Sequence, residues 1–263
     1  MRRLRRCIEV LFLTGLTLLF IGVGADWWGW MAKVQFLPSV LRLATEAGAL
    51  NVGILCGLLA LTLAFGRIYC SAICPLGALQ DCAIALRRLA DRRLPAALRK
   101  RFSYSGEHKA LRAFFLAATA ADLLSEVQFV AAALAPYSAY GRIVRSVTGL
   151  GDKGIGAATL VTGLLTLAGI TSCAVLWGRI WCNTVCPVGT FLGLVSRGSL
   201  FRMEIDSSKC IGCRRCGRQC KAACIDTENH AIDRSRCLVC FDCVKACNEG
   251  AIKFVPRKWK PKK

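Results

Sequence analysis

Histidine is scarce in this chain of 263 residues: there are two, and neither stands in a C-x-x-C-H element. The sequence therefore offers no case for a haem. Acidic residues are also few, because 16 Asp and Glu stand against 36 Lys and Arg, a formal charge of +20. Such an excess would suggest nucleic acid in a soluble protein, but here it falls in short loops beside apolar segments. We therefore predict contact with anionic membrane lipid and no nucleic acid.

Apolar residues, by contrast, make up 55% of the chain, and the mean hydropathy is +0.47. The excess is concentrated before residue 200, which is typical of a membrane protein with a small soluble tail. We predict an all-α membrane domain over residues 1–200 and a small α+β ferredoxin domain over 201–255. A basic tail, 256–263, would lie against the lipid surface.

Cysteine is abundant, with 17 residues, and eight of them form two C-x2-C-x2-C-x3-C elements near the C-terminus. In a 4Fe-4S module of this spacing, three thiolates hold one cluster and the fourth reaches across to the other. The crossed pattern predicts two clusters, held by Cys210, Cys213, Cys216 and Cys247, and by Cys237, Cys240, Cys243 and Cys220. A pair of structural zinc sites is the alternative, although zinc usually uses two C-x2-C pairs that lie farther apart.

Two details of this module depart from the common pattern. The Pro that usually follows the fourth Cys is replaced by Lys221 in the first element and by Asn248 in the second. Pro shapes that turn and removes a backbone donor, so its absence bears on the cluster potential. A ninth thiol, Cys224, aligns with Ala251, and we predict that it packs beside a cluster rather than ligating iron.

Four apolar segments approach the length of about 20 residues that a membrane span needs. They cover residues 7–25, 47–65, 110–133 and 154–177. The loop between the second and third holds eight Lys and Arg against two acids over residues 87–109. The positive-inside rule then predicts four transmembrane helices with both termini and the ferredoxin domain in the cytoplasm. Cleavage of the first segment as a signal peptide is the alternative, and it would leave the C-terminus on the same side.

A repeat lies in the membrane part. G-R-I-Y-C-S-A-I-C-P-L-G-A-L at 66–79 recurs as G-R-I-W-C-N-T-V-C-P-V-G-T-F at 178–191. Within each copy the two thiols share a helix face, and the Pro breaks the helix after them. The four thiols are Cys70, Cys74, Cys182 and Cys186. They could meet across a pseudo-twofold axis as ligands of an additional metal or cluster or as redox-active pairs, or they could be incidental to a structural corner.

The four spans, the two G-R-I-[YW]-C-x3-C-P-[LV]-G elements and the two-cluster module together resemble the NapH-type membrane ferredoxins, with relatives in MauN and the C-terminal half of NosR. The resemblance covers essentially the whole chain. It implies a multi-pass component of quinol oxidation in the bacterial inner membrane, rather than a stand-alone enzyme. Its partners would be the quinone pool and iron-sulfur or cytochrome electron-transfer proteins. The alternatives are a redox or metal maturation or regulatory factor for another complex, and a scaffold that docks a soluble ferredoxin.

Charged side chains near the spans are the remaining candidates. Asp122 and Glu126 stand i and i+4 on one face of the third segment, and ionisable groups within a span are usually functional. Because a quinol releases two protons with its two electrons, this pair could accept them. Alternatively, the helix ends early and the acids face water or pair with an arginine. For Arg67 and Arg179, beside the thiols, we expect snorkelling to lipid, with tuning of a cluster or quinone as the alternative.

Overall fold

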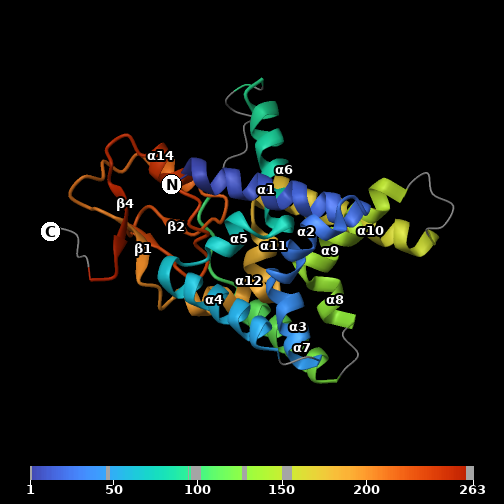
Figure 1. Ribbon diagram of the computed structural model, residues 1–263. Helices are drawn as coiled ribbons and strands as arrows, with labels where there is room; N and C mark the ends of the chain where they lie inside the picture. The colour runs from blue at the N-terminus through green and yellow to red at the C-terminus, as the bar shows by residue number, and fades with distance from the viewer. Residues whose placement is uncertain are drawn as a thin grey trace.

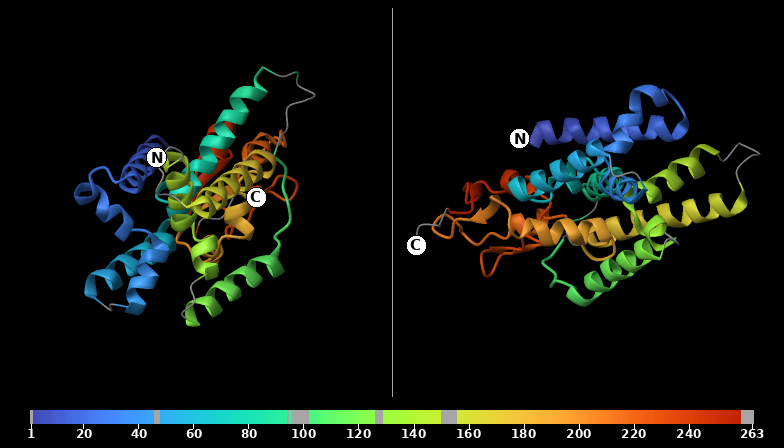
Figure 2. Two further views of the ribbon diagram at one scale, coloured as in Figure 1. Left: turned by 90° about the vertical axis from the view of Figure 1, so that its right-hand side faces the viewer. Right: turned by 60° about the horizontal axis from the view of Figure 1, so that its bottom comes forward.

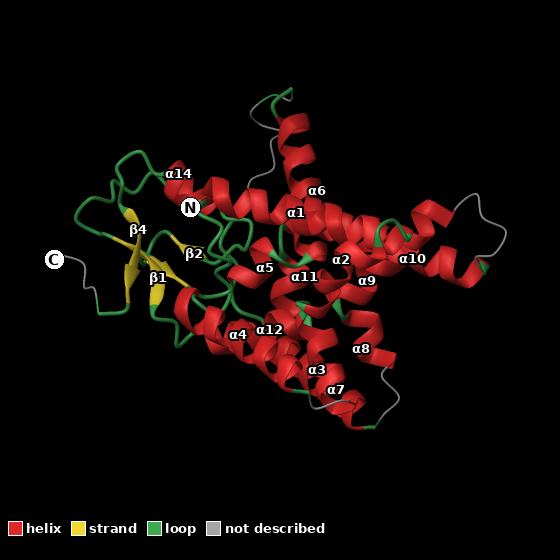
Figure 3. Ribbon diagram, viewed as in Figure 1, coloured by secondary structure: helices red, strands yellow, loops and turns green. Residues whose placement is uncertain are grey.

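The structure is a computed structural model that describes residues 2–45, 48–93, 95, 102–125, 129–149 and 156–258. In these residues it has fourteen helices and four short strands. Figure 3 colours them by type. The strands and the last two helices gather at one end of the molecule, and longer helices make up the rest (Figure 1). The protein is therefore mostly helical, with a small α+β ferredoxin domain at its C-terminal end.

Two three-helix units with the same design form the centre of the molecule. The first consists of α4 (Ala49–Phe65), α5 (Ile68–Ala72) and α6 (Pro75–Asp91), and the second of α10 (Ala157–Trp177), α11 (Ile180–Thr184) and α12 (Pro187–Ser196). Each long helix ends at a glycine with positive φ, 79° at Gly66 and 76° at Gly178, a conformation that other residues rarely adopt. The last helix of each unit begins with proline at its first turn, where no backbone donor is needed.

The remaining helices surround these two units. They are α1 (Arg2–Ile21), α2 (Ala25–Lys33), α3 (Phe36–Thr45), α7 (Lys109–Leu124), α8 (Phe129–Leu134) and α9 (Pro136–Thr148). Helix α1 packs on α6 and α9, α3 packs on α4, α7 packs on α12, and α9 runs along α10. Figure 1 and the right-hand view of Figure 2 place the α9–α10 end of the molecule opposite the strands.

Of the described helices, α10 is long and apolar enough to cross a membrane, with 21 residues. Helices α1 and α2 meet the same test only as a pair bent by 116°. The apolar helix α4 has 17 residues, and α7 ends at Leu124, before the end of the predicted third span. Positive φ at Gly22 and Gly24 accompanies the end of α1. The topology of four spans therefore stays a prediction.

The ferredoxin domain repeats one small unit twice. Strand β1 (Phe201–Ile205) pairs antiparallel with β4 (Ile252–Pro256), and β2 (Ile225–Asp226) pairs with β3 (Ala231–Ile232). A short helix contains the third cysteine of each C-x2-C-x2-C-x3-C element: α13 (Arg215–Gln219) contains Cys216, and α14 (Asp242–Ala246) contains Cys243. The two helices pack on each other. The pairing of β1 with β4 brings the beginning and the end of the domain together.

The ferredoxin domain packs directly on the two helical units. Phe201 of β1 stacks on Phe65 at the end of α4, with ring centroids 5.8 Å apart, and Leu200 donates its backbone N–H to Leu63 at 2.7 Å. On the second unit, the backbone N–H of Arg179 donates to the carbonyl of Lys221 at 2.8 Å. The ferredoxin domain thus packs against the C-terminal ends of α4 and α10.

Candidate functional site

The four thiols of the C-x3-C-P elements lie together in the core between the two helical units. Cys70, Cys74, Cys182 and Cys186 are all buried. Burial raises the pKa of the Cys74 thiol, and the neighbouring charges of Cys182, Cys70 and Cys186 raise it further. Arg67 Nη2 contacts both the Cys182 carbonyl and Cys70 Sγ, so the two elements meet at this point. We refer to this group of four cysteines as the repeat thiol centre.

Two arginines cross between the units at this centre. Arg67 of the first unit donates through Nη2 to the carbonyl of Cys182 at 3.0 Å and approaches Cys70 Sγ at 3.8 Å. Arg179 of the second unit donates through Nη1 to the carbonyl of Cys70 at 2.8 Å. Their exposed fractions are 0% and 1%. The expectation that both arginines snorkel to lipid is therefore wrong: each is held by backbone carbonyls of the opposite unit, which lie deep in the protein.

The glycine of each C-P-[LV]-G element makes room for this crossing. A Cβ at Gly77 would lie 2.5 Å from both the Cys70 carbonyl and Arg179 Nη1. At Gly189 a Cβ would collide with the Cys182 carbonyl and lie 2.9 Å from Arg67 Nη2. Real Cβ atoms do not approach so closely, so both positions require glycine for packing. The motif glycines thus belong to the same construction as the arginines.

Polar donors also reach the sulfur atoms of the centre. Gln80 donates through Nε2 to Cys182 Sγ at 3.3 Å, and the backbone N–H of Gly189 donates to Cys186 Sγ at 3.4 Å. Burial raises the pKa of Cys70 and Cys186, as it does for Cys74, whereas the Arg67 guanidinium and the Gly189 N–H act in the opposite direction. Four buried thiols with cations nearby fit the donor set of an iron-sulfur cluster, whose iron would replace the protons.

The eight cysteines of the C-terminal module fall into two groups in space. Those predicted for the first cluster line one cavity of about 220 Å³, and those predicted for the second line another. The members of the first group are Cys210, Cys213, Cys216 and Cys247, and those of the second are Cys220, Cys237, Cys240 and Cys243. Each cavity therefore has the four predicted thiols from the crossed halves of the sequence, and the second also has Cys224 in its lining. Both sets of four fit a 4Fe-4S cluster.

The two cavities differ in their surroundings. Cys213 of the first group is exposed, whereas Cys220 and Cys243 of the second are buried. The ninth thiol, Cys224, lies against the second group, with its Sγ 3.5 Å from that of Cys220. Among the described residues, no three or more His, Cys, Asp or Glu stand close enough to hold a single metal ion. The first group thus faces solvent and the second faces the interior.

Lys221, which stands where proline is common, joins the ferredoxin domain to the first helical unit. Its Nζ lies 2.7 Å from Asp81 Oδ2 of α6 and 3.1 Å from Asp242 Oδ2 of α14. Asp81 also pairs with Arg179 Nε at 2.8 Å. Burial alone would raise the pKa of Asp81, but the charges of Arg179 and Lys221 outweigh it and lower the pKa. The departure from proline therefore supplies a buried ammonium group at the domain junction.

The acid pair of the third predicted span is only partly described. Asp122 is buried near the end of α7, and its Oδ2 accepts the backbone N–H of Ala131 at 2.8 Å. Glu126 lies outside the described residues, as does the end of the basic tail after residue 258. The described contact gives Asp122 a part in holding α8 against α7. Proton acceptance by Asp122 and Glu126 stays a prediction.

Comparison with known proteins agrees with this construction. A family model described as a 4Fe-4S binding domain matches residues 48–93 and 159–205. The two matched ranges contain the repeat thiol centre and end before Cys210. The family model thus matches the helical part of the chain. In the C-terminal module, the indication of 4Fe-4S clusters comes from the spacing of the cysteines. None of the solved structures matches the chain.

Three relatives are ferredoxin-type proteins. The methylamine utilization ferredoxin-type protein MauN of Paracoccus denitrificans is 30% identical over 82% of this chain and 74% of its own length. MauN of Methylorubrum extorquens is 30% identical over 74% of this chain and 60% of its own length. The ferredoxin-type protein NapH of Haemophilus influenzae is 27% identical over 60% of this chain and 48% of its own length. The chain thus spans less than two thirds of the lengths of the Methylorubrum MauN and the Haemophilus NapH. Its similarity to the Paracoccus MauN shows that it belongs to the NapH/MauN family of ferredoxin-type iron-sulfur proteins.

Proposed function

We propose that the protein is a membrane-anchored electron relay that exchanges electrons between the quinone pool and a partner redox protein. The observation that carries the proposal is that hydrogen bonds join residues next to the repeat thiol centre to residues next to the second group, while α13 and α14, which carry Cys216 and Cys243, pack on each other. The repeat thiol centre meets the second group of the ferredoxin domain through Arg179 and Lys221, and through Asn183, whose Nδ2 donates to the carbonyl of Ala222 at 3.1 Å. The first group, with exposed Cys213, continues the series to the surface.

Three groups of four cysteines would hold the clusters of this relay. The first cluster takes Cys210, Cys213, Cys216 and Cys247, the second takes Cys237, Cys240, Cys243 and Cys220, and a third takes Cys70, Cys74, Cys182 and Cys186. A 4Fe-4S cluster supplies one-electron transfer at a potential set by charge, burial and hydrogen bonds to its sulfur atoms. The match of a 4Fe-4S family model to the repeats supports the third assignment.

The polypeptide contributes positioning and electrostatics. The buried guanidinium groups of Arg67 and Arg179 offset the negative charge that four thiolates bring into a region of low dielectric. Because each arginine binds a carbonyl of the opposite unit, the same contacts also hold the two C-x3-C-P turns at a constant separation. The two arginines that would stabilise the negative charge of the thiolates therefore also fix the relative position of the two C-x3-C-P turns.

The location of the protein follows from the same proposal. Helix α10 would anchor the chain in the bacterial inner membrane, with further spans contributed by the segments around α1, α4 and α7. The ferredoxin domain begins five residues after the end of α12, so it stays close to the membrane surface. The basic loop over residues 87–109 favours the cytoplasmic side for that surface.

Reduction by a quinol tests the relay. The full chain, purified anaerobically in detergent and supplied with iron and sulfide, is mixed with a short-chain quinol and followed by electron paramagnetic resonance. We expect the reduced-cluster signal to appear with the quinol, and dithionite gives the total reducible signal. A protein that dithionite reduces but no quinol reduces would refute the relay and favour a maturation role.

A further inference from the structure

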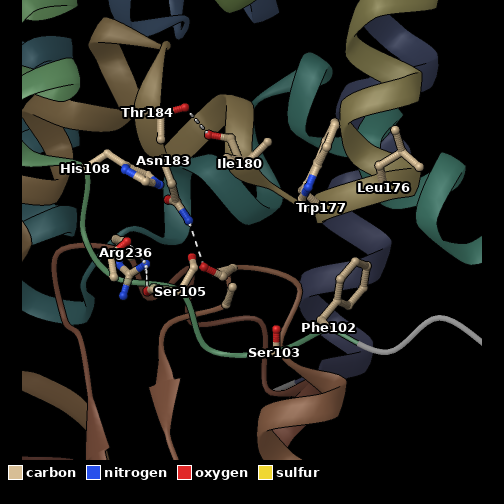
Figure 4. Close-up of a pocket in the computed structure, with 13 residues that line it drawn as sticks. Phe102, Ser103, Ser105, His108, Leu176, Trp177, Ile180, Asn183, Thr184 and Arg236 are labelled. Carbon is tan, nitrogen blue, oxygen red and sulfur yellow. Dashed lines mark hydrogen bonds between the residues drawn. The ribbon is translucent and has the colours of Figure 1, made fainter.

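A cavity separate from the two cysteine-lined cavities lies at the junction of the two domains (Figure 4). Its volume is about 320 Å³. It is enclosed by the end of α10, by α11, by the segment 102–108 and by residues of the ferredoxin domain. The cavity therefore lies between the repeat thiol centre and the second group of cluster cysteines, and we refer to it as the junction pocket.

The junction pocket has an apolar side and a polar side. Phe102, Leu176 and Trp177 provide aromatic and aliphatic surface, and Figure 4 shows them together on one side of the view. His108 and Arg236 lie on the other side, near Asn183. A pocket with this division suits a flat ring that carries oxygen atoms at its edge.

Hydrogen-bonding capacity is left over on the polar side. The Arg236 side chain is 96% buried; its Nε pairs with Asp233 Oδ2 at 2.6 Å, and its Nη1 donates to the carbonyl of Ser105 at 2.7 Å. Its buried Nη2 has no hydrogen-bond partner in the described structure. An unpaired buried donor is costly, so this atom points to a ligand acceptor. The His108 side chain is exposed, and no hydrogen bond of its ring is found among the described residues.

Both groups of thiols are neighbours of this pocket along the chain. Asn183 follows Cys182 of the repeat thiol centre, and Arg236 precedes Cys237 of the second cluster group. Ala222 and Ala223, which also line the pocket, lie between Cys220 and Cys224. A ligand in the pocket would therefore contact residues directly bonded to cysteines of both groups.

The pocket breaks the symmetry of the two helical units. Trp177 ends α10 where Phe65 ends α4: Phe65 stacks on Phe201 of the ferredoxin domain, and Trp177 lines the pocket and is 55% exposed. A second cavity, between α3, α4, α7 and α12, has Thr119 as a polar side chain. That hydroxyl already donates to the carbonyl of Phe115 at 2.8 Å. The described residues that line this apolar cavity thus offer no free side-chain donor for a carbonyl oxygen.

We propose that the junction pocket binds the head group of the quinol, with Arg236 as hydrogen-bond donor to one oxygen and His108 as proton acceptor at the other. The proposal rests on the proposed function and adds the location of its substrate. Oxidation of the quinol breaks two O–H bonds; one proton goes to a His108 ring nitrogen and the other to water. The two electrons go one at a time to the iron-sulfur clusters of the relay, each of which accepts one.

The lipid-soluble tail of a quinol has a path away from the pocket. Leu176 and Trp177 at the rim belong to α10, the helix best suited to cross a membrane. Farther along α10, Leu165 is also exposed. A hydrocarbon tail can follow this apolar helix face into the bilayer while the head group stays at the polar end.

Photolabelling with an azido-substituted short-chain quinone tests the location without relying on turnover. The full chain with its clusters is irradiated with the probe, digested and analysed by mass spectrometry. We expect adducts in the segments 102–109 and 176–184, and competition by excess unlabelled short-chain quinone. Trp177→Ala should weaken labelling about tenfold through loss of ring contact, while Trp27→Ala, at an exposed tryptophan of α2, should not.

A second measurement separates the site from the function. His108→Gln should slow quinol-dependent cluster reduction about 10²-fold while leaving probe labelling and dithionite reduction unchanged. If quinol reduces the clusters but the label maps to the apolar cavity lined by Phe36 and Phe191, the junction pocket is refuted and the relay stands. If no quinol reduces the clusters and no segment is labelled, both proposals are refuted.

Discussion

Replacement of Lys221 by methionine tests the junction between the ferredoxin domain and the helical units. The ammonium group lies between Asp81 and Asp242, and the lysine side chain is 7% exposed. Removing one partner of a buried ion pair typically costs about 3–5 kcal/mol. Each carboxylate keeps a second cation, Arg179 at 2.8 Å for Asp81 and Arg2 at 2.9 Å for Asp242. We therefore expect Lys221→Met to lower the free energy of unfolding by about 3 kcal/mol, the lower end of this range.

The assay is thermal unfolding of the full chain in detergent, followed by intrinsic tryptophan fluorescence. At roughly 2–4 °C per kcal/mol for a chain of this size, Lys221→Met should lower the midpoint by about 6–12 °C. Lys253→Met is the control, because Lys253 is 41% exposed, lies 3.6 Å from Asp206 and belongs to the class of surface pairs worth about 0–1 kcal/mol. Equal shifts for the two variants would refute the argument that the buried junction holds the domains together.

Acid should weaken the same junction. Burial raises the pKa of both Asp81 and Asp242, but the neighbouring cations outweigh it and lower both values. Groups whose folded pKa is lowered contribute stability that is fully present above their unfolded pKa of about 3.9 and is lost as the pH falls through the folded values. We therefore expect the melting temperature to decrease as the pH is lowered below about 4. The decrease should be less steep in Lys221→Met. Parallel profiles for the two proteins would contradict this assignment.

Three further changes probe the other groups. Replacing Cys70 and Cys182 together with serine should lower iron content by about one third if three equivalent clusters are present; unchanged iron, measured against total protein, would leave the repeat thiol centre structural. Gly189→Ala should destabilise the fold by about 1–3 kcal/mol, since its Cβ would collide with a carbonyl, whereas Gly53→Ala on α4, with open space around it, should be neutral or stabilising. Asp122→Asn should keep the melting temperature within about 2 °C, because an amide oxygen can still accept from Ala131. A quinol at the junction pocket, whose lining contains His108 and not Asp122, predicts unchanged turnover in this variant, whereas slower quinol oxidation would support proton acceptance by Asp122 instead.

Short spacings in the sequence carried the identity of the sulfur groups. Cysteines with two or three residues between them are joined by so little backbone that C-x2-C and C-x3-C-P restrict where the thiols can lie, whatever the rest of the fold does. The repeat of the C-x3-C-P element also allowed its internal symmetry to be predicted. The grouping of Cys247 with Cys210 and of Cys220 with Cys237 was predicted from the same crossed pattern, and the cavities of the ferredoxin domain bring these cysteines together.

Helix length was harder to predict from composition. An apolar run shows where chain can enter a membrane, but it does not show where a helix ends. Glycines 22 and 24, with positive φ, stand just after α1, and Ser125 ends α7, so predicted spans correspond to shorter or bent helices. Backbone conformation at a few positions thus decided what mean hydropathy alone could not.

The sequence by itself determined the two cluster motifs, the repeat and the family. Only the tertiary structure decided the partners of the charges: that Arg67 and Arg179 cross between the units, that Lys221 bridges two aspartates, and that Arg236 and His108 meet at one pocket. The partners of each contact lie tens to more than a hundred positions apart in the sequence. The sequence gives the sign of each charged side chain but not its partner. Its partner depends on which buried acceptors the packed helices bring within reach, and that is a property of the folded chain.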